Sequence, residues 1–401
     1  MLEVEDALSR ILAALPAPVS ERVLLPEVSG RVLTEKISSP INLPPFDNSA
    51  MDGYAVRAAD LGLAKADAPV TLRLAGRIPA GENFRGELAP GECIRLFTGS
   101  PLPRGADAVV MQEDTRLEPG RVGEVLICDT VRAGENVRRQ GDDVEQGALL
   151  VAAGNLLTPA HLSLLAAVGV RDANVGRRPV VGLLATGSEL REAGQALGPG
   201  QIFESNRAAL AALTTRAGGV PKCFPLVTDT LAATQAALEG ALAGCDVVVT
   251  SGGVSVGEMD FVKTAFEKIG GELQFWKVAM RPGKPFVFGR RGGKFLFGLP
   301  GNPVSAFVTF LLLVRPALCR WQGAREVTLS AILAVLAEPV SNPGDRCHFM
   351  RVRVDAAGKV LSAGRQASHA LASLAAANAL LSLPPGASWA AGTAVTVLRW
   401  D

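Results

Sequence analysis

Apolar and polar positions change their spacing several times along the chain. The first segment, residues 1–18, places apolar residues at helical intervals beside acidic ones, which predicts an amphipathic surface or interface helix. From Tyr54 to about Asn136, short apolar runs alternate with Gly/Pro turns, and this pattern predicts a β-rich module. Helical spacing returns in residues 136–170, where Thr158 is a plausible helix cap before a proline.

A different pattern begins near residue 177, where solid apolar runs alternate with helix-like segments. Runs of this kind, ended by Gly-containing turns, predict a parallel sheet with helices on both faces. A hairpin-like pair follows, and after it the longest apolar run, Val304 to Val314. A membrane span needs about 20 apolar residues, so we expect this shorter run to form a buried helix. The strand-like runs after Trp321 predict a terminal β-domain.

Composition and charge narrow the classes of function. The chain has 401 residues, which predicts several domains, and its 40 basic residues almost balance its 39 acidic residues. That balance argues against a general nucleic-acid binder, which would carry a basic excess. The acidic first segment lacks the basic start and apolar core of a signal peptide. We therefore expect a cytoplasmic protein that uses neither nucleic acid nor a membrane.

The cysteines and histidines limit the kind of metal that the chain can bind. Its six cysteines are too far apart in the sequence for a C-x-x-C clip, and it has only three histidines. We expect reduced and mostly buried thiols. Any bound metal should then be a hard cation held by carboxylates, such as Mg²⁺.

Three acidic side chains follow three successive strand-like runs of the predicted sheet. They are Glu189, Asp229 and Asp260, and each alone is more often a helix cap than a ligand. Ligands of open α/β sheets bind at the carboxyl ends of the strands, so these acids should lie near one site. Carboxylates gathered there would repel one another unless a cation such as Mg²⁺ sat between them.

A glycine-rich loop lies at the same edge of the predicted sheet. "SGGVSVG" supplies Ser251, Gly252, Gly253 and Gly257, and its freed backbone N–H groups suit phosphate oxygens. The motif matches neither of the common nucleotide loops, so it could also be a purely structural turn.

Two further turns add candidate binding residues. "KVAMRPGKP" carries Lys277, Arg281 and Lys284, which form either a solvated turn or an anion pocket. "GLPGNPVSAF" holds two prolines and an asparagine, which form either a rigid entry to the buried helix or a wall of the site. These are Pro300, Asn302 and Pro303.

The loop "PPFDNSAMDGYAV" combines two carboxylates with the only tyrosine of the chain. We expect Asp47 to brace the loop by accepting backbone N–H bonds, and Tyr54 to pack at its base. Asp52 remains as the candidate functional carboxylate.

Taken together, these stretches resemble the motif series of molybdopterin molybdenumtransferases, the family of the bacterial MoeA proteins and the gephyrin E domain. The order and spacing match from about residue 1 to 326, and the last segment fits more loosely. The motifs are "PPFDNSAMDGYAV", "FTGSPLPRGADAVV", "QGDDV", "LATGSEL", "IFESNRAAL", "TSGGVSVGEMDFV", "RPGKPFVFG" and "GLPGNPVSAF".

The resemblance implies an elongated, four-domain protomer that forms a homodimer. Its doubly wound parallel-sheet α/β domain would be of the molybdopterin-binding type and would stand beside a β-rich module and a C-terminal β-domain. The expected boundaries are 1–45 with 137–175 for a linking domain, 46–136 for the β-rich module, 176–326 for the α/β domain and 327–401 for a β-barrel-like domain.

The resemblance also implies the last step of molybdenum cofactor synthesis. Molybdate enters adenylylated molybdopterin, and AMP leaves with the help of Mg²⁺. A molybdopterin adenylyltransferase would be the upstream partner. The dithiolene sulfurs belong to the substrate, so no cysteine cluster is required.

Carried over position by position, the resemblance implies catalytic roles for Asp52, Thr98, Glu189, Asp229 and Asp260. The last three of these acids would hold the metal. The β-rich module of the partner subunit would complete the pocket, so Asp52 and Thr98 would act across the dimer. The chain departs from the family pattern at Ser188, where an acid is expected, and at Arg281, where lysine is common.

Three alternatives remain open from the residues. The α/β domain alone would also suit a molybdopterin adenylyltransferase or an amidase that acts on a pyridine nucleotide. Neither of these needs the "MDGYAV" module or the terminal β-domain. A gephyrin-like scaffold is the third alternative.

Overall fold

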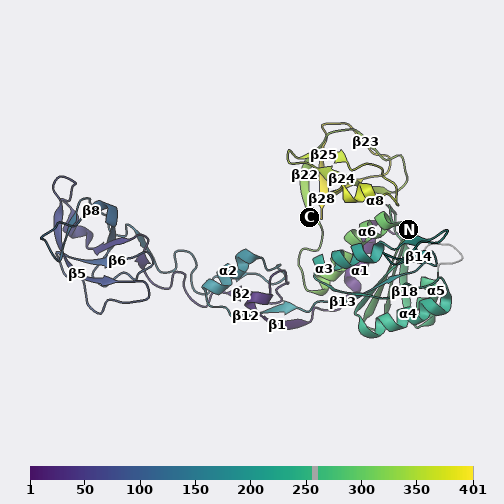
Figure 1. The fold of residues 1–401 in the computed structure, drawn as a ribbon, viewed down its shortest axis with the longest axis horizontal. Helices are drawn as coiled ribbons and strands as arrows, with labels where there is room; N and C mark the ends of the chain where they lie inside the picture. The colour runs from purple at the N-terminus through teal and green to yellow at the C-terminus, as the bar shows by residue number, and fades with distance from the viewer. Residues whose placement is uncertain (255–260, 401) are drawn as a thin grey trace. The chain divides into compact units, whose positions relative to one another are not determined.

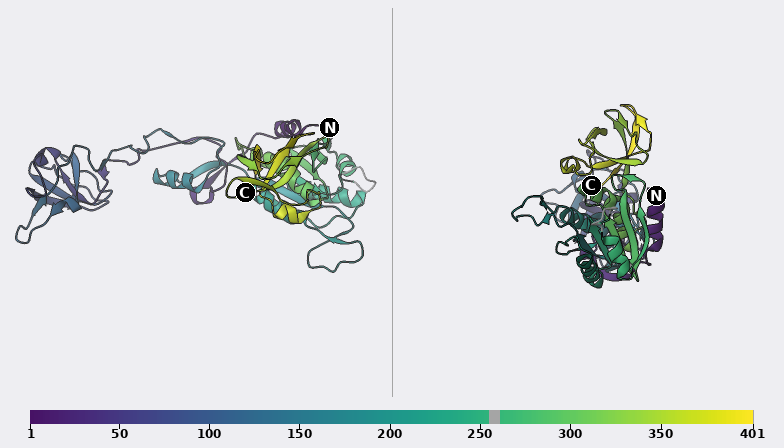
Figure 2. Two further views of the ribbon diagram at one scale, coloured as in Figure 1. Left: turned by 90° about the horizontal axis from the view of Figure 1, so that it is seen from above. Right: turned by 90° about the vertical axis from the view of Figure 1, so that its right-hand side faces the viewer.

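The computed structural model describes residues 1–254 and 261–400. They form two compact units. One unit contains residues 1–35, 153–158 and 172–401, and both chain termini belong to it (Figure 2). The other contains residues 36–152 and 159–171.

A six-stranded mixed sheet forms the centre of the first unit. Its order is β16-β13-β17-β21-β20-β18, and the first four strands are parallel. Strand β20 forms a hairpin with β21 and runs antiparallel to both of its neighbours, β21 and β18. The strands are β13 (Val180–Ala185), β16 (Val220–Cys223), β17 (Val247–Ser251), β18 (Glu272–Lys277), β20 (Pro285–Arg291) and β21 (Lys294–Leu299). The predicted parallel α/β sheet and its hairpin are confirmed.

Helices cover both faces of this sheet (Figure 1). Successive residues of a strand point to opposite faces, so Val247 and Val249 pack with α1, α3 and α6, whereas Val248 packs with α4 and α5. The helices are α1 (Val4–Ala14), α3 (Asn206–Arg216), α4 (Leu231–Gly244), α5 (Val262–Lys268) and α6 (Pro303–Thr309). The carboxyl ends of β13 and β17 therefore open at one edge between two apolar layers.

The longest apolar run forms a buried helix, as predicted. Helix α6 continues through a π-helical segment, η4 (Phe310–Val314), into α7 (Arg315–Trp321). Pro316 has no N–H to donate to the carbonyl of Leu312, four residues earlier, and Leu312 lies within the π-helical segment. Among the described residues, this is the one helix long and apolar enough to cross a membrane, and most of it is buried inside the protein.

A five-stranded barrel follows the α/β layers. Strand β26 pairs with both β24 and β28, which closes the ring β24-β25-β22-β28-β26. The strands are β22 (Ser330–Leu336), β24 (Cys347–Val354), β25 (Lys359–Ser362), β26 (Ala379–Leu383) and β28 (Ala394–Arg399), with α8 (Leu371–Ala375) between two of them. The short strand β19 (Met280–Arg281) joins the barrel by pairing in parallel with β24. The predicted terminal β-domain is confirmed, and its contact with Arg281 brings it to the candidate site.

Three short two-stranded sheets complete the first unit. They are β1 (Ser20–Leu24) with β12 (Asp172–Gly176), β14 (Leu190–Arg191) with β15 (Ile202–Phe203), and β23 (Val340–Ser341) with β27 (Ser388–Trp389).

The second unit is built around another six-stranded sheet, of order β7-β4-β6-β5-β9-β8. Its strands are β4 (Gly53–Val56), β5 (Val70–Ile78), β6 (Glu92–Leu96), β7 (Ala108–Met111), β8 (Thr115–Arg116) and β9 (Glu124–Ile127). Tyr54 is buried in the core of this sheet, as expected. The unit also contains β2 (Ile37–Ser38), β3 (Asn48–Ser49), β10 (Val137–Arg138), β11 (Leu149–Val151) and α2 (Pro159–Ala167).

Candidate functional site

The glycine-rich loop begins where strand β17 ends. Gly252 and Gly253 have φ angles of +92° and +66°, a region that favours glycine. A Cβ on Gly252 would lie 2.5 Å from the carbonyl oxygen of Thr186, and one on Gly253 would lie 2.8 Å from Val262. The two glycines are therefore required by both conformation and space. Gly257 lies outside the described residues.

Two of the three predicted metal ligands lie on neighbouring strand ends. Asp229 accepts a hydrogen bond from the backbone N–H of Ser188 at 2.9 Å, and Ser188 Oγ accepts one from the backbone N–H of Asp229 at 3.1 Å. Ser188, which replaces the expected acid, thus ties the two turns together. Glu189 is exposed beside it, and Asp260 lies outside the described residues. Within the described ranges, no group of three or more His, Cys, Asp or Glu side chains could hold a metal ion.

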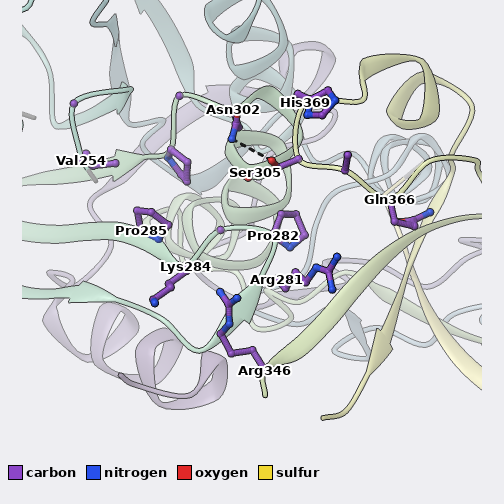
Figure 3. Close-up of a pocket in the computed structure, with 16 residues that line it drawn as sticks. Val254, Arg281, Pro282, Lys284, Pro285, Asn302, Ser305, Arg346, Gln366 and His369 are labelled. Carbon is purple, nitrogen blue, oxygen red and sulfur yellow. Dashed lines mark hydrogen bonds between the residues drawn. The ribbon is translucent and has the colours of Figure 1, made fainter. Parts of the chain in front are cut away.

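A pocket of about 570 Å³ opens between the α/β layers and the barrel (Figure 3). Five predicted residues line it: Gly253, Arg281, Lys284, Pro300 and Asn302. The structure therefore brings together the glycine-rich loop, the basic turn and the entry to α6. The other candidates that the first unit contributes within the described residues do not line the pocket; they are Ser251, Gly252, Lys277, Pro303, Glu189 and Asp229.

The barrel side of the pocket was not predicted from the sequence. It contributes Arg346, Gln366, Ser368 and His369. In Figure 3 the side chain of Arg346 extends toward the turn that carries Arg281 and Lys284. The one sequence signal was a short polar run, "RQASH", in an otherwise Ala/Leu-rich segment.

Hydrogen bonds fix the barrel loop against the first turn of α6. Asn302 Nδ2 donates to Ser368 Oγ at 3.1 Å, and the backbone N–H of Val304 donates to the Ser368 carbonyl at 3.1 Å. Gln366 exchanges hydrogen bonds with the backbone of Arg351, at 2.9 Å in each direction. The loop that completes the pocket is therefore held from both sides.

The pocket is strongly positive. Arg281, Lys284 and Arg346 contribute three cationic groups, and no Asp or Glu occurs among its described lining residues. Behind it, His348 pairs with Arg281 across β19 and β24 and is only 5% exposed. Burial, followed by the charges of Arg281 and Arg351, lowers the pKa of His348 to about 4. His348 is therefore neutral at pH 7, and the pocket charge comes from the three cationic groups.

Asp52 and Thr98 meet in the second unit. Asp52 Oδ1 accepts hydrogen bonds from the backbone N–H of Thr98 at 2.7 Å and from Thr98 Oγ1 at 2.8 Å. These bonds, backbone first, lower the pKa of Asp52, with a smaller contribution from the charge of Arg95. Asp52 is thus a partly exposed carboxylate that stays ionised at neutral pH.

Asp47 braces the same loop, as expected. Its carboxylate accepts the backbone N–H of Gln140 at 2.8 Å and pairs with Arg139 at 2.7 Å. The Gln140 bond is the main cause of its lowered pKa.

Comparison with known proteins gives three family models in order along the chain. The model described as "MoeA N-terminal region (domain I and II)" matches residues 2–169. The model described as "Probable molybdopterin binding domain" matches residues 182–320, and "MoeA C-terminal region (domain IV)" matches residues 333–400.

Curated relatives match over nearly the whole chain. The molybdopterin molybdenumtransferase of Haemophilus influenzae is 39% identical over 389 residues, which cover 96% of this chain and 94% of the relative. Molybdopterin molybdenumtransferase 2 of Mycobacterium tuberculosis is 41% identical over 386 residues, which cover 94% of each. A solved structure of the molybdopterin biosynthesis MoeA protein from Pyrococcus horikoshii covers 100% of both chains with a TM-score of 0.85 at 30% identity.

Proposed function

Because the chain belongs to the MoeA family of molybdopterin molybdenumtransferases, we propose on that premise that it inserts molybdate into adenylylated molybdopterin and releases AMP. The family establishes a transferase that inserts molybdenum during molybdenum cofactor synthesis. The adenylylated substrate, the release of AMP and the need for Mg²⁺ are parts of the proposal.

One observation carries the proposal most directly, namely the charge of the pocket. Its three cationic side chains and the absence of carboxylates among its described lining residues suit a small dianion such as molybdate. The pocket volume of about 570 Å³ falls in the range of small-molecule sites and leaves room for the dithiolene end of the pterin. Molybdate would therefore meet the dithiolene sulfurs of the pterin within the same pocket.

The residues of the pocket would act by position and charge. Arg281, Lys284 and Arg346 would hold the oxyanion, since guanidinium and ammonium groups form charge-assisted hydrogen bonds with oxyanion oxygens. The backbone of Gly252 and Gly253 would approach a phosphate closely. An oxygen of water or molybdate would attack the pterin-side phosphorus of the pyrophosphate while the bond from that phosphorus to the bridging oxygen breaks. AMP would leave with the bridging oxygen, the attacking oxygen would stay on the pterin phosphate, and fixed positive groups would stabilise the charge that develops.

Magnesium would fit the carboxylates of the strand ends. Glu189 and Asp229 lie on turns that Ser188 joins, and the oxygens of carboxylates are ligands that Mg²⁺ prefers. We propose that these two acids and Asp260 hold the ion, which would neutralise charge on the bridging phosphates. Replacement of Asp260 by Ala should then abolish AMP release, and unchanged turnover would refute the metal role.

We also propose a cytoplasmic homodimer that receives its substrate from a molybdopterin adenylyltransferase. In this arrangement the partner subunit supplies Asp52 and Thr98. Mixing an Asp52→Ala chain with an Asp229→Ala chain tests this, because one wild-type site re-forms in each mixed dimer. Activity that stays at the level of either variant after subunit exchange would refute the shared site.

The function itself is tested with adenylylated molybdopterin, Mg²⁺ and a molybdate titration, with AMP as the measured product. AMP release that requires molybdate supports the transferase. Adenylylation of free molybdopterin with ATP would instead indicate the adenylyltransferase, and binding without turnover would indicate a scaffold.

A further inference from the structure

An arginine in the β-rich module lies beside the Asp52–Thr98 pair without contacting it directly. Arg95 lies in β6, and its cross-strand neighbours are Tyr54 on one side and Arg77 on the other. Its guanidinium carbon is 5.0 Å from the ring centroid of Tyr54 and 5.2 Å from that of Phe97. Arg95 thus stacks against both aromatic rings that adjoin the pair.

The hydrogen bonds of Arg95 complete this arrangement. Nη1 donates to the carbonyl oxygen of Gly53 at 3.3 Å, and Nη2 donates to Oε1 of Gln112 at 2.5 Å. Gly53 directly follows Asp52 in the sequence, and Phe97 directly precedes Thr98. One side chain therefore contacts a neighbour of each member of the pair, through the carbonyl of Gly53 and the ring of Phe97.

The hydrogen bonds between Thr98 and Asp52 use only one of the two carboxylate oxygens of Asp52. Both hydrogen bonds from Thr98 go to Oδ1 of Asp52, and within the described residues Oδ2 accepts none. Oδ2 is thus left for substrate, provided that Thr98 stays in register with Asp52. The positive charge of Arg95 acts in the same direction, since it helps to lower the pKa of Asp52.

Packing alone does not explain an arginine at this position. Arg77 and Arg95 lie directly opposite each other on neighbouring strands, and like charges in that arrangement destabilise a sheet. Arg77 also stacks over Phe97, at 4.9 Å, and within the described part of the chain it forms no ion pair. An apolar residue in place of Arg95 would remove the repulsion, but it would also remove the hydrogen bond to Gly53 and the contact with Phe97, the residues next to Asp52 and Thr98.

We propose that Arg95 is a positioning residue for the transfer reaction, because it holds Asp52 and Thr98 in their hydrogen-bonded register. The inference rests on the proposed function of that pair. A planar guanidinium can stack on two rings and donate two hydrogen bonds, and an ammonium group cannot match this geometry.

The test compares Arg95→Gln, Arg95→Lys, Thr98→Ala and the double variant Arg95→Gln/Thr98→Ala in the AMP-release assay. Arg73→Gln is the matched control, since Arg73 is exposed on the same sheet and pairs with Glu92. We expect Arg95→Gln to lower kcat about 10- to 100-fold and to change the KM for molybdate less than about threefold. Arg95→Lys should keep an intermediate kcat, and the control should match wild type.

The double variant distinguishes positioning from an independent effect. Thr98→Ala keeps the backbone N–H bond to Asp52, so if Arg95 acts through this pair, the loss of kcat in the double variant should be clearly smaller than the product of the two single losses. Losses that multiply would overturn the inference, as would a wild-type kcat in Arg95→Gln. Thermal unfolding of every variant identifies misfolding, and Arg95→Lys provides the same comparison if Arg95→Gln does not fold.

Different results would refute the proposed role of the Asp52–Thr98 pair and the inference about Arg95. A wild-type kcat in Thr98→Ala would refute the proposed role of the pair, and the inference about Arg95 would fall with it. A strong loss in Thr98→Ala together with full activity in Arg95→Gln would refute only the inference.

Discussion

Replacing Arg346 by Gln should weaken the use of molybdate more than any other step of the reaction. Arg346 is the cation that the barrel adds to the basic turn, and Nη1 also donates to the carbonyl of Met280 at 3.3 Å. The variant removes one of three cationic groups and keeps a shorter, neutral polar side chain. It leaves Arg281 and Lys284 in place, so the substrate pocket should remain formed.

The expected magnitude follows from the exposure of the side chain. A hydrogen bond to a charged group contributes about 1.5–3 kcal/mol, and each 1.4 kcal/mol changes binding tenfold. Arg346 is 27% exposed, so water and salt screen part of its charge, and the lower half of that range applies. We therefore predict that KM for molybdate rises about 10- to 30-fold.

The assay is the initial rate of AMP release against molybdate concentration at saturating adenylylated molybdopterin. The kcat value should recover at high molybdate, because the lost contact is made in both ground and transition states. Arg290→Gln is the control. Arg290 does not line the pocket, its side chain is 52% exposed, and its Nε lies 2.9 Å from a carboxylate oxygen of Glu272. An unchanged KM for molybdate in Arg346→Gln would refute the assignment of the pocket.

Two further variants test the glycine-rich loop and the buried histidine. Gly252→Ala should lower kcat/KM at least tenfold, because its Cβ would lie 2.5 Å from the Thr186 carbonyl oxygen. The control Gly292→Ala should keep wild-type activity, because Gly292 is also at positive φ but a Cβ there would have nothing within 4 Å. Equal kinetics in the two variants would contradict a role of the glycine-rich loop in the reaction. His348 has its pKa lowered from 6.5 to about 4, so the unfolded state binds its proton first and stability falls by about 3 kcal/mol as pH drops from 6.5 to 4. The denaturant midpoint of His348→Phe should vary less with pH over that range than the midpoint of wild type. An identical pH dependence in the two proteins would contradict the lowered pKa of His348.

The sequence predicted the α/β layers well because their apolar pattern is local. Val247, Val248 and Val249 form one solid run, and such runs predict strands that are buried on both faces. The positions of Gly252 and Gly253 could also be interpreted in advance, since a turn at a strand end requires glycine. The pattern of residues 221–228 in the sequence predicts a strand that is longer than the one the structure contains. Strand β16 ends at Cys223, before Pro225, whose missing N–H cannot join a sheet ladder.

The barrel side of the pocket could not be predicted in the same way. Arg346 reaches the basic turn because β19 pairs with β24, and that pairing joins residues more than sixty positions apart. Ser368 reaches Asn302 across 66 positions of the sequence. No local spacing encodes such a contact. Lys277 shows the same limit of local spacing. The sequence placed it in the anion site because its strand ends next to the basic turn, but Lys277 does not line the pocket.

Molybdate binding in this pocket is tested most directly with a crystal of the protein that is soaked with molybdate and measured at the molybdenum absorption edge. We predict an anomalous molybdenum peak in the pocket, with the oxygens of the oxyanion within about 2.7–3.2 Å of the side-chain nitrogens of Arg281, Lys284 and Arg346. A well-occupied molybdenum peak elsewhere on the protein, with this pocket filled only by solvent, would contradict it.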